Sequence, residues 1–214
     1  MIQKNKTTLI ITSIMLLLPM LVGLLLWDQL PQQVPSHWNI HGEVDGWSSK
    51  PFAVFGLPGI LLAMHWTCVL ASCADPKAKN YTPKMLTVVL WICPVLSLVL
   101  NSMVFAAALG YQINIEIILP LLSGLLFIII GNLLPKCRQS YTMGIKLPWT
   151  LANEENWNKT HRLGGKVWVI GGAIIMATSL WGSFWILMGA TLLMVLIPTV
   201  YSYCLYRRQE KTDN

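Results

Sequence analysis

The sequence predicts an all-α, polytopic integral membrane protein with six transmembrane helices and with both the N-terminus and the C-terminus in the cytoplasm. Of its 214 residues, 55% are hydrophobic and only 11% are charged, whereas charged residues make up about 25% of a soluble domain. Several apolar segments approach the ~20 residues that a helix needs to cross a bilayer. The positions of the basic residues predict the number and the direction of the crossings.

Six apolar segments are the candidate spans. They cover residues 7–27, 52–73, 85–109, 117–134, 167–181 and 184–206. Residues 167–206 cannot be one span, because such a helix would be about 60 Å long against a hydrocarbon core of ~30 Å. We therefore expect a turn between Trp181 and Trp185. The fifth span is short, which indicates that its helix begins before Gly164 or crosses a locally thinner bilayer.

The basic residues are distributed very unevenly between the two sides of the membrane. With six spans, 14 of the 15 lysines and arginines fall on one side, and Lys50 alone falls on the other. Cytoplasmic loops carry the excess of Lys and Arg. Residues 74–84 and the loop 135–166 are therefore predicted to be cytoplasmic, and the loop 28–50 extracytoplasmic. This distribution explains the net charge of +6 without direct binding to nucleic acid.

The outer loop, residues 28–50, contains Pro31, Pro35, Gly42 and Gly46. These residues predict a turn-rich segment rather than one long helix. Four side chains of this loop are of types that ligate divalent metals: His37, His41, Glu43 and Asp45. Their spacing matches no established zinc motif, so solvated turns are the favoured interpretation. We predict no bound metal and no cofactor.

Three polar residues fall within the predicted spans: His65, Asn101 and Asn132. An ionisable group at membrane depth indicates a functional site by default. For His65 two interpretations stay open, a functional role and a neutral imidazole that bonds a neighbouring helix. For Asn101 we expect a hydrogen bond between helices.

The inner loop, residues 135–166, is the longest polar interval of the chain and combines basic with aromatic residues. Pro148 favours an extended conformation at the residue before it. Asn153 is a candidate N-cap, and Glu155 and Lys159 are spaced for an ion pair along a helix. Trp157 and His161 have the same spacing and should share a face. The pair Gly164-Gly165 predicts a sharp turn or a close helix contact. A membrane-interface anchor and a binding surface are both compatible with this pattern.

Motifs of enzymes are not visible in the sequence. It contains no G-x-S-x-G elbow, no Walker loop, no dinucleotide fingerprint and no H-E-x-x-H. The five cysteines form no C-x-x-C pair, so neither a zinc site nor a disulfide framework is indicated. We therefore predict that the protein is not an enzyme and has no catalytic residues.

Two sequence patterns resemble a known family. The pattern G-N-x-x-P-K…G-I-K-x-P-W-T-L…W-x-K-T-H-R-x-G-G resembles the signature of the SdpI family of bacterial membrane proteins. The residues that carry it are Gly131, Asn132, Gly144, Ile145, Pro148, Trp149, Thr150, Leu151, Trp157, Lys159, Thr160, His161, Arg162 and Gly164. Lys146 and Leu147 stand where family members often have Arg-Thr, and Lys cannot replace the bidentate contacts of Arg. Residues 30–47, L-P-x-x-V-P-x-H-W-N-x-x-G-E-x-D-G-W, resemble a module of unknown function that often accompanies such proteins.

This resemblance implies two regions. Residues 1–73 would be the N-terminal module, with span 1, the loop 28–50 and span 2. Residues 74–214 would be the SdpI-like region, with spans 3–6 and the loop 135–166.

The resemblance also implies a function. The protein would be a multi-pass immunity protein of the bacterial plasma membrane that gives resistance to a secreted killing peptide. In the family's type member, engagement of the toxin also leads to capture of a transcriptional repressor at the membrane. The alternative is a small transporter or a metal-dependent membrane enzyme that uses His65, His37 and His41.

The two loops provide the candidate sites. The surface that faces the toxin would comprise His37, Trp38, Asn39, His41, Gly42, Glu43, Asp45 and Trp47. The cytoplasmic surface that binds a partner would comprise Gly144, Lys146, Pro148, Trp149, Thr150, Trp157, Lys159, Thr160, His161 and Arg162. The expected partners are therefore the secreted toxin peptide, the cytoplasmic transcriptional repressor and the lipid bilayer.

Overall fold

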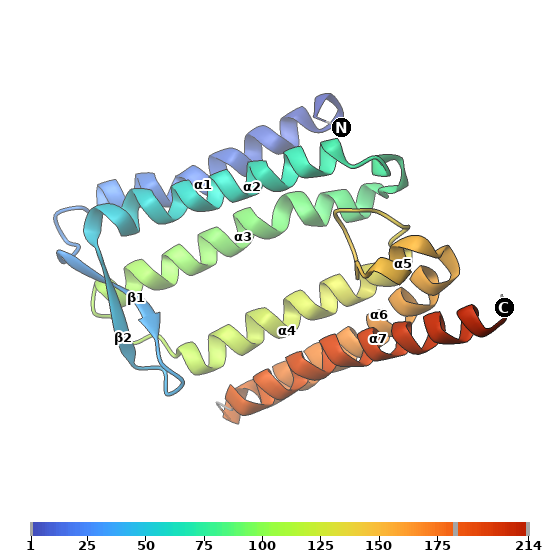
Figure 1. The fold of residues 1–214 in the computed structure, drawn as a ribbon. Coiled ribbons are helices and arrows are strands. Elements are labelled where there is room, and N and C mark those ends of the chain that lie inside the picture. Colours follow the sequence, from blue (N-terminus) through green and yellow to red (C-terminus); the bar gives the residue numbers. More distant parts are fainter. Residues whose placement is uncertain (1, 182–183, 213–214) are drawn as a thin grey trace. The chain divides into compact units, whose positions relative to one another are not determined.

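The computed structural model describes residues 2–181 and 184–212. Within these residues, six helices are long and apolar enough to cross a membrane (Figure 1): Gln3–Leu25, Phe52–Ala74, Pro83–Ala108, Ile115–Lys136, Glu154–Trp181 and Phe184–Gln209. The prediction of a mostly helical, multi-pass membrane protein with six transmembrane helices is therefore confirmed. The turn predicted between Trp181 and Trp185 includes residues 182–183, which lie outside the described residues.

The chain forms two compact units. The first comprises Met1–Ala74 and Leu86–Ile115, and the second comprises Asp75–Met85 and Glu116–Asn214. The predicted regions 1–73 and 74–214 were defined by sequence resemblance, whereas the two units are defined by compactness. The predicted division therefore stays a prediction.

The first unit contains three long helices: α1 (Lys6–Leu25), α2 (Leu57–Ala74) and α3 (Pro83–Ala108). One core cluster joins Leu9, Val69 and Leu90, so each of the three helices contributes a buried side chain. Gly23 lets α1 approach its neighbours closely, because a Cβ atom there would lie 2.8 Å from the methyl groups of Val54. Many large apolar side chains of α1 are exposed, among them Leu25 at 75%, as expected for a helix that faces lipid.

The outer loop contains a β-hairpin that the sequence analysis did not predict. Strands β1 (Gln33–Trp38) and β2 (Val44–Ser49) pair antiparallel, with Gln33 opposite Ser49 and Trp38 opposite Val44. The register shifts between Pro35 and Trp38, so that Ser36 of β1 and Asp45 of β2 have no partner opposite them in the register. The prolines and glycines of this loop indicated turns correctly. They also interrupt the alternation of apolar and polar residues that indicates strands.

The second unit contains α4 (Ile115–Leu133), α5 (Pro148–Ala152), α6 (Glu154–Thr178) and α7 (Phe184–Thr212). Helices α4 and α6 cross closely along glycines. A Cβ atom on Gly172 would lie 2.6 Å from the carbonyl oxygen of Gly124, and one on Gly131 would lie 3.0 Å from that of Gly165. Small residues of this kind let helix backbones approach each other in a membrane. The close helix contact predicted for Gly164-Gly165 is therefore confirmed, and the alternative of a sharp turn there is wrong.

The fifth span begins earlier than residue 167. Helix α6 starts at Glu154 and continues through both glycine pairs, so the interpretation that the helix begins before Gly164 is confirmed. Its first turns are polar and its later turns are apolar. A single helix therefore connects the inner loop with the membrane.

Candidate functional site

The inner loop is organised around Asp75, a buried carboxylate in the short segment between α2 and α3. Its side chain accepts hydrogen bonds from the Tyr81 hydroxyl at 2.6 Å and from the backbone N–H of Lys77 at 2.8 Å. It also accepts bonds from the backbone N–H groups of Tyr141 and Thr142 at 2.9 and 3.0 Å. One carboxylate therefore connects the segment 75–82 with residues more than sixty positions later.

These contacts shift the ionisation of Asp75 and Tyr81. Burial by itself would raise the pKa of Asp75, but hydrogen bonds from Tyr81, Lys77, Thr142 and Tyr141 lower it, and the net pKa lies below the ordinary value. Burial, together with the hydrogen bond to Asp75, raises the pKa of Tyr81 to about 12. At neutral pH the pair is therefore a carboxylate and a neutral phenol that donates to it.

Gln139 makes a second connection within the loop. Its side-chain amide donates to the carbonyl oxygens of Thr150 and Leu151 at 2.9 and 2.7 Å. Its side-chain oxygen accepts a bond from Lys77 Nζ, and its backbone oxygen accepts one from Asn80 at 2.7 Å. The sequence analysis named neither Asp75 nor Gln139 as a site residue. The available signal was that Asp75 is the sole acidic residue among the lysines of residues 74–84.

Gly144, Trp157 and His161 form the centre of the inner loop. The rings of Trp157 and His161 stack with centroids 4.0 Å apart, so these residues share one helix face as predicted. His161 Nδ1 lies 2.8 Å from the Trp157 carbonyl oxygen, and Nε2 lies 2.8 Å from the backbone nitrogen of Ile145. An N–H must donate in each contact, so the proton is on Nδ1 and Nε2 accepts from Ile145. Gly144 has φ +107°, and a Cβ atom there would lie 2.8 Å from the Trp157 ring.

Cys137 completes this centre. Its carbonyl oxygen accepts a hydrogen bond from Trp157 Nε1 at 2.7 Å. Burial raises the pKa of the Cys137 thiol to about 12, so the thiol is neutral and is not a reactive thiolate at physiological pH.

Contacts of its first residues hold helix α5 in place. Leu147 is extended before Pro148, as predicted, with φ −121° and ψ 152°. The Thr150 hydroxyl accepts a bond from the Leu147 N–H at 2.9 Å. Trp149 Nε1 donates to the Ser202 hydroxyl of α7, and the Trp149 ring contacts Tyr203 with centroids 5.4 Å apart.

The N-terminus of α6 has the two local features that its sequence predicts. Asn153 is the N-cap and accepts a hydrogen bond from the Asn156 N–H at 2.9 Å. Lys159 pairs with Glu155 at 2.6 Å.

The predicted inner-surface residues divide into two sets. Thr150, Trp157, Thr160 and His161 are buried and hold the loop together. Gly144, Lys146, Pro148, Lys159 and Arg162 are exposed, and Trp149 is partly exposed. The exposed set alone is accessible to a partner.

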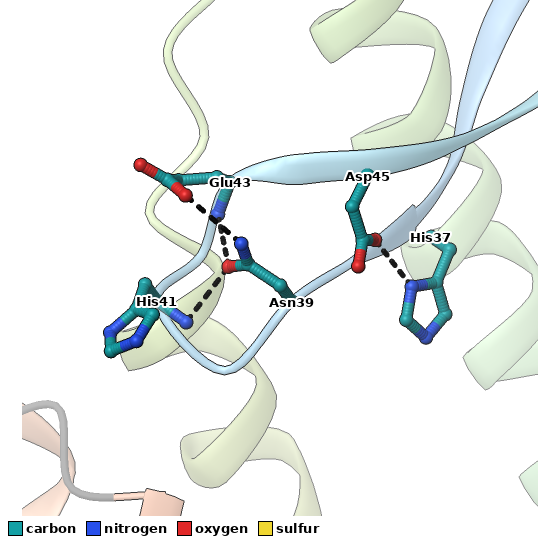
Figure 2. Close-up of polar contacts among 5 residues, drawn as sticks. All are labelled: His37, Asn39, His41, Glu43 and Asp45. Carbon is teal, nitrogen blue, oxygen red and sulfur yellow. Dashed lines mark hydrogen bonds and ion pairs between the residues drawn. The ribbon is translucent and has the colours of Figure 1, made fainter.

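Figure 2 shows the polar contacts of the outer hairpin. The Asn39 side-chain oxygen accepts the backbone N–H groups of His41 and Glu43 at 2.9 and 3.0 Å, and its amide donates to the Glu43 carboxylate at 2.9 Å. These bonds define the turn, in which Gly42 has φ 72°. His37 Nδ1 lies 2.5 Å from an Asp45 carboxylate oxygen. The imidazole of His41 points away from the other labelled side chains.

The hairpin exposes acidic and aromatic side chains, whereas the lysine that follows it, Lys50, is buried. Glu43 and Asp45 are exposed, and Trp47 is 58% exposed. Lys50 is 6% exposed, donates to the Trp27 carbonyl oxygen at 3.0 Å and lies 5.1 Å from the centroid of the Trp27 ring. Within residues 2–181 and 184–209, no group of three His, Cys, Asp or Glu side chains is placed to hold a metal ion.

The three intramembrane polar residues make separate contacts. His65 Nε2 lies 3.2 Å from the Thr12 hydroxyl of α1. Among the described residues, the hydrogen bond between helices expected for Asn101 is not found; its amide donates to the Ser97 carbonyl oxygen of its own helix at 2.8 Å. Asn132 is exposed and donates to the Ile128 carbonyl oxygen, also on its own helix, at 2.9 Å.

The helices and the two polar surfaces define a multi-pass membrane protein that carries a folded hairpin in its first unit and a folded polar loop in its second. Residues 136–202 match the SdpI/YfhL protein family, and residues 14–62 match a domain of unknown function, DUF1648. The resemblance of the inner loop and the spans that follow it to the SdpI family is therefore confirmed.

A relative matches along nearly the whole chain. "Immunity protein SdpI" of Bacillus subtilis (strain 168) is 28% identical over 202 residues, which are 93% of this chain and 96% of the relative. Its name describes an immunity protein and not an enzyme. No solved structure matches the chain significantly.

Proposed function

We propose that this protein is a plasma-membrane immunity protein that protects its cell against a secreted killing peptide. The observation that carries the proposal is the similarity to "Immunity protein SdpI" over 93% of this chain and 96% of the relative. An alignment of this extent includes both polar loops and at least part of each of the six candidate spans. Such a protein needs no catalytic residue. It has only to bind the peptide more tightly than the peptide binds in its damaging state.

In this proposal both termini are cytoplasmic and the hairpin β1–β2 faces outward. The support is the charge distribution, because Lys50 is the one Lys or Arg within residues 28–50. Lys50 is itself buried against Trp27, so the difference in exposed positive charge between the two sides is larger than the residue counts indicate. The outer hairpin then presents carboxylates without a competing exposed lysine.

The hairpin is the proposed surface for the toxin. Its exposed carboxylates at Glu43 and Asp45 lie on the same short hairpin as the exposed indole of Trp47. This combination fits a basic, amphipathic peptide, since the carboxylates attract cationic side chains and the indole contacts apolar ones. His37, Trp38, Asn39, His41 and Gly42 complete the surface and fix its turn.

The inner loop is the proposed surface for a cytoplasmic transcriptional repressor. Lys146, Pro148 and Arg162 are exposed on a scaffold that Thr150, Trp157 and His161 hold together. A rigid scaffold limits the entropy cost of binding a protein partner. Capture would work through this protein surface, with no direct contact to nucleic acid.

Expression in a toxin-sensitive strain tests the proposed immunity. We expect the wild-type chain to raise survival when the cognate peptide is added. The variant Glu43→Gln/Asp45→Asn should protect less, whereas Glu116→Gln, a matched neutralisation outside the hairpin, should protect as the wild type does. If killing by every candidate peptide is unchanged although the protein is inserted in the membrane, the proposal is wrong.

Pull-down of cytoplasmic proteins tests the second surface separately. We expect a repressor to be retained by the wild-type protein after exposure to the toxin, and to be lost with Lys146→Glu/Arg162→Glu. Lys84→Glu is a control with one charge reversal, because Lys84 is also exposed but lies outside the inner loop. Retention that is equal for both variants would contradict the assigned surface.

The alternative, a transporter or a metal-dependent enzyme that uses His37, His41 and His65, is tested by metal analysis of purified protein. Stoichiometric zinc that is lost in the variant His37→Ala/His41→Ala would favour this alternative over immunity.

A further inference from the structure

A groove in the second unit is lined by apolar residues and by the inner loop. Its volume is about 330 Å³, at the lower end of the range for small-molecule sites. Leu134 follows the end of α4, Trp168 belongs to α6, and Met194 and Pro198 belong to α7. Gly144 and Ile145 close the end next to the inner loop. We call this feature the α4–α7 groove.

The shape of the groove follows from Pro198 and Gly144. Pro198 has no N–H, so the carbonyl oxygen of Met194 has no partner within α7. Trp168 Nε1 supplies the missing donor at 3.0 Å and holds its indole against α7. Gly144 contributes no side chain, and a Cβ atom there would collide with Trp157.

The lining does not suit water. A buried water needs two to four polar partners. The Trp168 N–H is already bonded to Met194, and the Thr199 hydroxyl donates to the Val195 carbonyl oxygen at 2.8 Å. Three spans of a multi-pass membrane protein surround the groove, so hydrocarbon is the medium next to it.

Two exposed lysines are close in sequence to lining residues of the groove. Lys146 directly follows Ile145, and its ammonium donates to the Thr142 carbonyl oxygen of the inner loop at 3.3 Å. Lys136 lies two residues after Leu134. Exposed cations next in sequence to an apolar lining match a molecule that has an anionic head and a hydrocarbon tail.

We propose that the α4–α7 groove binds one anionic phospholipid. One acyl chain lies between α4, α6 and α7, and the phosphate contacts Lys146 and Lys136. This site is independent of the proposed immunity, since it needs neither a toxin nor a repressor. Because Ile145 lines the groove and its N–H bonds His161 at 2.8 Å, the bound chain also contacts the segment that shapes the inner loop.

Native mass spectrometry of the full chain tests the proposal, with phosphatidylglycerol and phosphatidylcholine of identical chains as the two probes. We expect one tightly bound phosphatidylglycerol and weaker binding of phosphatidylcholine. Lys146→Gln should weaken phosphatidylglycerol binding about fivefold, the equivalent of ~1 kcal/mol for one lysine near a headgroup, and should leave phosphatidylcholine binding unchanged. Lys84→Gln, the matched control, should change neither.

A second pair of variants tests the acyl chain. Thr199→Trp fills the groove and should weaken phosphatidylglycerol binding about tenfold, the equivalent of ~1.4 kcal/mol, because the indole takes the space of the acyl chain. Val200→Trp places the same indole one residue further along α7, at a position that is 57% exposed and does not line the groove. It should bind as the wild type does.

The proposal would be overturned if Thr199→Trp and Val200→Trp bound phosphatidylglycerol equally, or if the wild type bound the two lipids equally. It would also be overturned if a second protein chain, and not a lipid, occupied the groove. Crosslinking of wild-type protein to phosphatidylglycerol with a photoreactive acyl chain is a check that needs no variant. Modified peptides should contain residues 130–134 or 194–199, and modification confined to other segments would contradict the assigned groove.

Discussion

His161 Nε2 accepts the backbone N–H of Ile145 at 2.8 Å, while its Nδ1–H donates to the Trp157 carbonyl oxygen. The imidazole is 1% exposed; its Nε2 connects α6 with the segment around Ile145, and its Nδ1–H bonds within α6. A side chain in the signature pattern of the loop therefore has a clear structural role. The stability of the loop should depend on it.

We expect His161→Phe to destabilise the protein by about 1–3 kcal/mol, because the ring volume is kept while the Ile145 N–H loses its acceptor. Unfolding in increasing denaturing detergent measures the change. Arg162→Ala, at the exposed neighbouring position, is the control and should cost less than about 0.5 kcal/mol. Equal stability of the two variants would show that the bond to Ile145 contributes nothing.

Gly144→Ala should destabilise the protein more than Gly110→Ala. Both glycines have positive φ, +107° and +88°, so both variants carry the backbone strain of about 1 kcal/mol or more. A Cβ atom at Gly144 would also lie 2.8 Å from Trp157, whereas no atom of the residues that the structure describes lies within 4 Å of one at Gly110. The difference in unfolding midpoint between the two variants isolates the steric part. A larger loss for Gly110→Ala would contradict the packing of the inner loop.

The contacts of Asp75 predict a loss of stability in acid. Its pKa is lower in the folded protein, so its contribution is present above the pKa of the unfolded chain and is lost as pH falls through the folded pKa. We expect the unfolding midpoint of the wild type to decrease between pH 6 and pH 3 more steeply than that of Asp75→Asn. Parallel pH profiles of the two proteins would refute the role of the carboxylate.

The raised pKa of Tyr81 predicts a loss of stability at high pH. Its pKa is raised to about 12, so its contribution is complete below the ordinary tyrosine pKa of ~10 and is lost as pH rises toward 12. Tyr81→Phe should be less stable at neutral pH but should change less than the wild type between pH 9 and pH 12. Thermal unfolding across this range measures both effects, and an unchanged alkaline slope would contradict the prediction.

Cysteine labelling tests which face each loop occupies. In a background without the native cysteines, Ser36→Cys should react in intact cells with a reagent that cannot cross membranes. Asn158→Cys should react only after permeabilisation. Both positions are exposed in the structure, so protection would reflect the membrane and not burial in the protein. The reverse pattern would invert the topology and exclude both proposed binding surfaces.

The candidate site was predictable wherever its geometry is local. Asn153 as N-cap, the pair of Glu155 and Lys159, and the shared face of Trp157 and His161 all depend on spacings of three or four residues. The hairpin was missed because its prolines and glycines interrupt the alternation that indicates strands. The roles of Asp75 and Gln139 were missed because the loop partners that define these roles are 11 to 67 residues away in the sequence: Tyr141 and Thr142 for Asp75, and Thr150 and Leu151 for Gln139.

By itself, the sequence determined that this is a membrane protein with six crossings and two polar loops, because length, hydropathy and positive charge act on each segment independently. Only the tertiary structure decided which loop residues are exposed and which are buried. His161, Trp157 and Thr160 look like surface residues in a polar segment, yet they are buried and hydrogen-bonded in the folded loop. The physical reason is that a polar side chain can be buried once partners are present, and those partners come from segments that only folding brings together.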